Sequence, residues 1–131
     1  MRVRLLVDLG NWFTSRRQYS RALRLYRFAL GLWPDVVSRQ IVLINRGVAQ
    51  LRMRQPEAAY LTFAEALADQ HLRAGAKYLA AGYYNLGLAC RRTGRETEAI
   101  RRFDEAIETL PNSVYARAAQ RALRERPSDQ G

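Results

Sequence analysis

Few side chains in this sequence could carry out catalytic or metal chemistry. Cys90 is the single cysteine and His71 the single histidine, so these residues can form neither a zinc cluster nor an internal disulfide. Ser15, Ser20, Ser38 and Ser113 lie in no nucleophile elbow, and no glycine-rich loop is present to cradle a phosphate. We therefore expect no enzymatic activity, no cofactor and no metal site.

Arginine supplies most of the charge. The net charge is +10, carried by 21 arginines and one lysine, and residues 1–54 hold 11 basic and 2 acidic side chains. The chain is thus most basic in its N-terminal part. The preference for arginine over lysine is typical of GC-rich genomes, so we expect a bacterial source.

Four of these arginines, which we call the basic face, follow helical spacing: Arg17, Arg21, Arg24 and Arg27. One interpretation is a solvated outer face of a helix. The other is an attachment surface for an acidic partner, an anionic membrane or nucleic acid. The sequence leaves both open.

An internal repeat reveals the helices on which the candidate residues lie. Glycine, then alanine 12 residues later, an aromatic residue 4 later and alanine 3 later occur three times. The copies are Gly10, Ala22, Tyr26, Ala29; Gly47, Ala59, Phe63, Ala66; and Gly87, Ala99, Phe103, Ala106. Small residues at such spacing let two antiparallel helices approach closely, while the aromatic side chain fills the groove between them.

This pattern resembles the tetratricopeptide repeat family, and residues 84–111 are close to a consensus repeat. Pro34 and Pro111 close the first and third copies, while His71 stands in the place of proline in the second. The resemblance implies an all-α solenoid of three antiparallel helix pairs with a C-terminal solvating helix. We expect one domain over residues 1–126, with repeats at about 3–34, 40–71 and 80–111 and a capping helix at 112–125, followed by a frayed tail at 127–131.

The helix ends follow from local signals. Pro56 suits the first turn of a helix, and Asn112-Ser113 can cap the last one. The glycines are 37 and 40 residues apart, which exceeds the family period of 34. We attribute the excess to longer helices and wider connections, with residues 35–39 extending one helix and residues 71–80 lengthening the first helix of the third copy.

In the resembled family, the first helix of each pair lines a concave groove that receives a partner segment. Carried over by position, this groove contains Val7, Asn11, Ile41, Ile44, Asn45, Val48, Arg52, Tyr84, Asn85, Leu88, Arg91 and Arg92. Amides bind a ligand backbone and arginines bind carboxylates, so a protein or peptide segment with apolar anchors and acidic residues would fit. Some family members clamp an acidic chaperone tail, but Val7, Ala81 and Asn85 stand where that clamp needs basic residues.

We therefore expect a protein–protein interaction scaffold or adaptor. The alternatives are an assembly factor for a membrane complex such as photosystem I, self-association through the ends of the stack, and electrostatic attachment through the basic face. Sequence-specific RNA reading is not expected, because the groove residues are mostly apolar. The longest apolar runs fall far short of the ~20 residues that cross a bilayer, so we expect a cytoplasmic protein, or one peripheral to a membrane.

Overall fold

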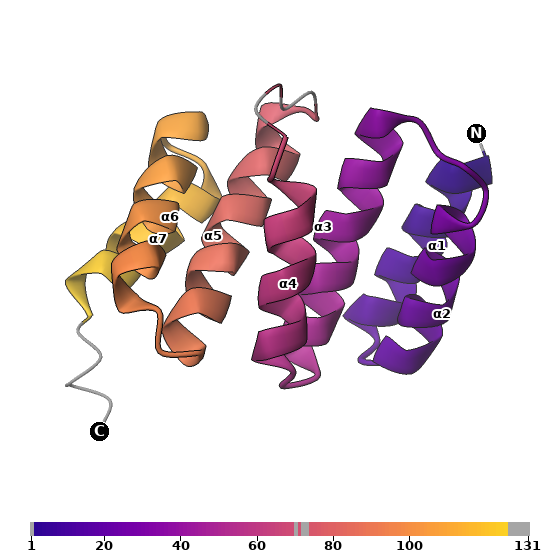
Figure 1. Ribbon diagram of the computed structural model, residues 1–131, viewed down its shortest axis with the longest axis horizontal. Coiled ribbons are helices and arrows are strands. Elements are labelled where there is room, and N and C mark those ends of the chain that lie inside the picture. The colour runs from indigo at the N-terminus through magenta and orange to yellow at the C-terminus, as the bar shows by residue number, and fades with distance from the viewer. Residues whose placement is uncertain (1, 70, 72–73, 126–131) are drawn as a thin grey trace.

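The computed structural model describes residues 2–69, 71 and 74–125, and this part of the chain forms seven α-helices. They are α1 (Arg2–Ser15), α2 (Tyr19–Leu30), α3 (Val36–Arg52), α4 (Pro56–Ala66), α5 (Ala76–Arg92), α6 (Glu96–Thr109) and α7 (Val114–Arg124). Consecutive helices form antiparallel pairs that stand side by side, and α7 packs on α5 and α6 at the C-terminal end (Figure 1). The predicted all-α solenoid of three pairs with a C-terminal helix is confirmed.

A glycine of the first helix faces an aromatic ring of the second helix in every pair. A Cβ built on any of these glycines would lie 2.5 or 2.6 Å from a ring carbon, closer than real Cβ atoms approach. The pairs are Gly10 with Tyr26, Gly47 with Phe63 and Gly87 with Phe103. Each ring is fully buried and contributes about 2–3 kcal/mol of hydrophobic stabilisation. The repeat pattern therefore marks the sites where two helices touch most closely.

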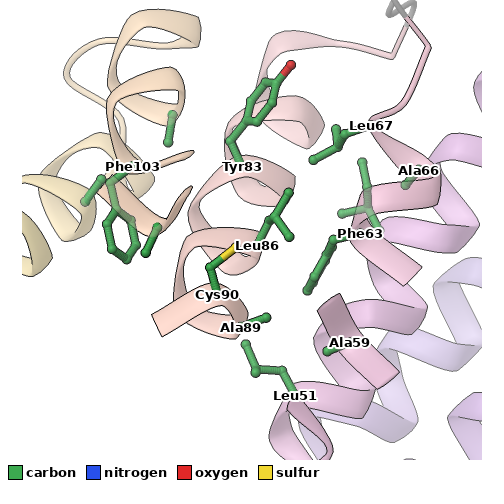
Figure 2. Packing of buried hydrophobic residues seen from close by; sticks show 14 of the residues in the cluster. Leu51, Ala59, Phe63, Ala66, Leu67, Tyr83, Leu86, Ala89, Cys90 and Phe103 are labelled. Atoms are coloured by element: carbon green, nitrogen blue, oxygen red, sulfur yellow. The ribbon is translucent and has the colours of Figure 1, made fainter. Parts of the chain in front are cut away.

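The core between the pairs is built from these rings and from small side chains. Figure 2 shows Phe63, Leu86 and Cys90 packed together, with Phe103 beside them. The repeat alanines of the second helices are all at most 2% exposed: Ala22, Ala29, Ala59, Ala66, Ala99 and Ala106. Because their side chains are short, neighbouring helices approach without leaving voids.

Gln40 connects α3 to the long segment between α4 and α5. Its Nε2 donates to the carbonyl oxygen of Ala66 at 3.3 Å, and its Oε1 accepts from the backbone N–H of Ala74 at 3.2 Å. The predicted extension of the helix from residue 71 is wrong, because α5 begins only at Ala76. The residues before it, from Ala74, belong to a connection that Gln40 holds against α3, which accounts for part of the 40-residue spacing between Gly47 and Gly87.

The starts of α3, α4 and α7 follow local signals. Asp35 precedes α3 and accepts a hydrogen bond from the N–H of Ser38 at 2.7 Å. Pro56 occupies the first turn of α4, and Ser113 Oγ accepts from the N–H of Ala116 at 3.0 Å at the start of α7. None of the described helices is long and apolar enough to span a membrane.

The first helix of each pair ends in the same turn. The backbone N–H three residues beyond the helix terminus donates to a carbonyl oxygen in the last turn of the helix: Gln18 to Phe13 at 2.9 Å, Gln55 to Gln50 at 3.0 Å and Arg95 to Cys90 at 2.8 Å. This geometry requires a left-handed residue just before that N–H, and glycine is the usual choice.

Glycine occupies that position in only one of the three turns. Gly94 has φ +80°, whereas the equivalent residues of the first two pairs are Arg17 at φ 60° and Arg54 at φ 63°. An L-residue in this conformation costs about 1 kcal/mol. Arg17 therefore lies in the turn before α2, and its predicted place on that helix is wrong.

The close approach at Gly47 predicts a loss of stability on adding one methyl group. Gly47→Ala places a Cβ against the ring of Phe63 and should lower the free energy of unfolding by about 2 kcal/mol, measured by urea denaturation. Gly82→Ala is the matched control, because its Cβ would meet Ile44 and Leu67 at an ordinary 3.4 Å and should stabilise α5 by roughly 0.5–1 kcal/mol. Equal effects at both sites would contradict this account of the repeat glycine.

Candidate functional site

The first helices of the three pairs share a hollow of about 480 Å³. Seven of the predicted groove residues line it: Asn11, Ile44, Asn45, Val48, Arg52, Tyr84 and Asn85. Tyr115 of α7 completes the lining, and no aspartate or glutamate of the described chain takes part in it. The hollow combines amides, apolar side chains and positive charge.

Asn11 is oriented by the core of the first pair. Tyr26 Oη donates a 2.6 Å hydrogen bond to Asn11 Oδ1 and lies 3.3 Å from Thr14 Oγ1. Burial raises the pKa of Tyr26, so its hydroxyl keeps the proton that it donates at neutral pH. Asn11 consequently turns its Nδ2 amino group outward as a donor.

Asn45 and Asn85 occupy equivalent places in the second and third pairs. The Nδ2 group of each donates at 2.8 Å to the carbonyl oxygen four residues earlier, that of Ile41 or of Ala81. Among the described residues, the Oδ1 and the second N–H of each amide have no further hydrogen-bond partner and can bond a ligand. Two such amides on neighbouring helices suit the alternating donors and acceptors of an extended backbone.

The structure divides the remaining predicted groove residues between two other hollows. Val7 and Ile41 line a small one between α1 and α3, and Tyr78 lines both this hollow and the main one. Leu88, Arg91 and Arg92 line one between α5 and α7.

Arg91 is engaged within the protein. Its Nε and Nη2 bond the carboxylate of Glu96 at 2.9 and 2.8 Å, and its Nη1 donates to the carbonyl oxygen of Ala122 at 2.7 Å. The hydrogen bond to Glu96 raises the pKa of Arg91, and only 8% of its side chain is exposed. Arg91 therefore fastens α7 to α5.

Ser15, Lys77, Tyr78 and Tyr115 also line the main hollow, and sequence reasoning did not place them in the groove. Lys77 precedes Ala81 by one helical turn and thus shares its face, a signal that the sequence already carried because Lys77 lies in the segment expected to extend this helix. The place of Tyr115 in the lining became apparent only from the packing of α7, which puts its ring centroid 6.4 Å from that of Tyr84.

The structure also places the surfaces that concern two other predictions, attachment through the basic face and self-association. Arg21, Arg24 and Arg27 are exposed along α2, so the basic face without Arg17 is a solvent-facing stripe. Leu5 and Trp12 on α1 are 66% and 48% exposed, and self-association, which stays a prediction, would use this end of the stack.

The two isolated reactive side chains do not meet. Cys90 is fully buried on α5, whereas His71 is exposed in the connection after α4, where its backbone N–H donates to Asp69 Oδ1 at 2.7 Å. Burial raises the pKa of the Cys90 thiol to about 12. Cys90 thus acts as a small core residue.

Solved structures support the fold. The TPR domain of Arabidopsis OM64 is 22% identical, with a TM-score of 0.76 and 94% of each chain covered. The Sgt2 TPR domain from Aspergillus fumigatus is 24% identical, with a TM-score of 0.74 over 98% of this chain and 82% of that one. The first TPR of Spaghetti (RPAP3), bound to the HSP90 peptide SRMEEVD, is 20% identical, with a TM-score of 0.71 over 95% and 94%.

The stacked helix pairs and the shared hollow define a helical-repeat scaffold, the architecture of protein–protein interaction modules. Residues 5–35 and 80–113 each match the tetratricopeptide repeat in sequence. The chain is a tetratricopeptide repeat protein.

The burial of Cys90 predicts that its thiol is inert in the folded protein. With its pKa raised to about 12, almost no thiolate is present at pH 8, and iodoacetamide should leave Cys90 unmodified for hours. In 6 M guanidinium chloride the same thiol should react within minutes, as followed by intact-protein mass spectrometry. Rapid labelling without denaturant would contradict the packing around α5.

Proposed function

We propose that this protein is a scaffold that holds a segment of a partner polypeptide in the main hollow. The observation that carries the proposal is the convergence of Asn11, Asn45 and Asn85, one from each pair, on one hollow with amide groups left to bond a ligand. An extended backbone supplies matching donors and acceptors along its length.

The lining also indicates the side chains that the segment carries. Val48 and Tyr84 offer apolar contact area over the buried Ile44, and Arg52 and Lys77 add exposed positive charge with no acidic side chain of the described residues beside them in the lining. Carboxylates of the segment therefore gain favourable interactions, whereas basic side chains are repelled. The segment combines apolar anchors with acidic residues.

The comparison with RPAP3 bound to SRMEEVD supports an acidic peptide as the class of ligand. Two of the places that need lysine in a chaperone-tail clamp hold Val7 and Ala81 here, and both are buried. The cations of this hollow are Arg52 and Lys77 instead. We infer that the chain prefers a different spacing of apolar and acidic residues from that of SRMEEVD.

Assembly of a membrane complex would use the same hollow with a particular partner, so it is a special case of this proposal. Electrostatic attachment would instead use Arg21, Arg24 and Arg27, whose exposed stripe lies on α2, outside the hollow. The amides and the apolar lining favour polypeptide binding over charge alone.

A selection experiment tests the proposal. Peptides selected by the wild-type protein from a random heptapeptide library should be enriched in aliphatic and acidic residues, and SRMEEVD serves as a reference peptide. The double variant Asn45→Ala/Asn85→Ala should bind the selected peptides about 30-fold more weakly by fluorescence anisotropy, because each lost amide contact is worth about 1 kcal/mol.

Gln120→Ala is the matched control, since it removes an exposed amide of α7 that does not line the hollow. It should leave peptide affinity unchanged. Undiminished binding by the Asn45/Asn85 double variant would refute the hollow as the binding site.

A further inference from the structure

A further hollow, distinct from the three described above, lies next to the main hollow where the first helices of the pairs end. Four arginines surround it. This hollow has a volume of about 570 Å³, and its lining includes Arg17, Arg52, Arg54 and Arg92 but no acidic residue of the described chain. We call these four residues the arginine cluster. They come from three different helix pairs, so only the stacking of the pairs brings them together.

No described carboxylate neutralises the arginine cluster. All four residues are exposed, and none of them forms an ion pair within the described residues. Elsewhere the protein pairs its arginines readily, as Arg95 does with Glu57 at 2.9 Å and Arg102 with Glu105 at 3.1 Å. Like charges gathered without counter-charge repel one another, and a bound anion relieves this repulsion.

A favourable position at a helix C-terminus explains only two of the four arginines in the cluster. Arg52 and Arg92 lie in the last turns of α3 and α5, where a cation interacts favourably with the helix dipole. Arg17 and Arg54 stand at left-handed turn positions, where the third pair has Gly94. Strained residues of this kind cluster at functional sites.

The hollow of the arginine cluster adjoins the main one, because Arg52 and Asn85 line both. We propose that the arginine cluster binds acidic side chains of the same segment that the main hollow holds, which rests on the proposed function. Four guanidinium groups around one hollow match several carboxylates rather than a single chain terminus. The cluster thereby fixes which end of the segment is acidic.

The test extends a library-selected heptapeptide by four glutamates or four glutamines, at its N-terminus or its C-terminus. The glutamate peptide should bind about tenfold more tightly than its glutamine counterpart at one end only, because the arginine cluster lies at one end of the main hollow. The gain should shrink when NaCl is raised from 50 to 300 mM, as expected for exposed charges.

Arg17→Gly/Arg54→Gly should abolish the glutamate gain and leave the affinity for the glutamine peptide unchanged. The same variant should melt at a higher temperature than the wild type, because glycine relieves the left-handed strain. Loss of the gain therefore cannot be ascribed to unfolding. Arg27→Gln/Arg117→Gln removes the same charge from exposed sites outside the hollow and should preserve the gain.

An equal glutamate gain at both ends, or a gain that persists in Arg17→Gly/Arg54→Gly, would overturn the inference while leaving the main hollow as a binding site. Tighter binding of an eight-nucleotide oligothymidylate than of the glutamate peptide, lost in the same variant, would reassign the cluster to nucleic acid and also overturn it. Failure of the wild type to bind the glutamine peptide would instead refute the proposed function.

Discussion

The whole stack depends on the contact between a glycine and an aromatic ring inside each helix pair. At 2.5–2.6 Å from a ring carbon there is no room for a Cβ, so the ring presses directly on the backbone of the first helix. This contact sets the separation of the two helices, and the repeat alanines let the next pair pack just as closely. The second helices thereby hold the first helices in one row, and the row forms the main hollow.

The first pair shows how this core contact reaches the surface. Its ring belongs to Tyr26, whereas the other two pairs have phenylalanine, and only the tyrosine hydroxyl extends far enough to bond Asn11. Tyr26, a core residue, thus orients the amide of Asn11 in the hollow. The second and third pairs orient Asn45 and Asn85 through backbone carbonyls of their own helices, so three amides are fixed by two different means.

Arginine serves several physical roles within one chain. Arg91 is a structural tie between α5 and α7, Arg102 bridges Glu98 and Glu105 along α6, and Arg27 is simply solvated. Arg17 and Arg54 occupy turn positions that favour glycine and face a hollow without acidic residues. The residue type is the same throughout, and the local backbone and the neighbouring helices determine the role.

The sequence by itself determined the repeat, the three helix pairs and the C-terminal helix, because close packing restricts residue size at fixed positions and leaves a periodic pattern. It also identified the amides of the hollow, since their place relative to the repeat glycine is local. It placed Arg17 on a helix, because spacing alone cannot distinguish a last helical turn from a left-handed one. Only the tertiary structure decided that α5 begins at Ala76, that Arg91 is engaged internally, and that arginines of three pairs surround one hollow. Those facts depend on how helices distant in sequence stack, and no local pattern of residues encodes that geometry.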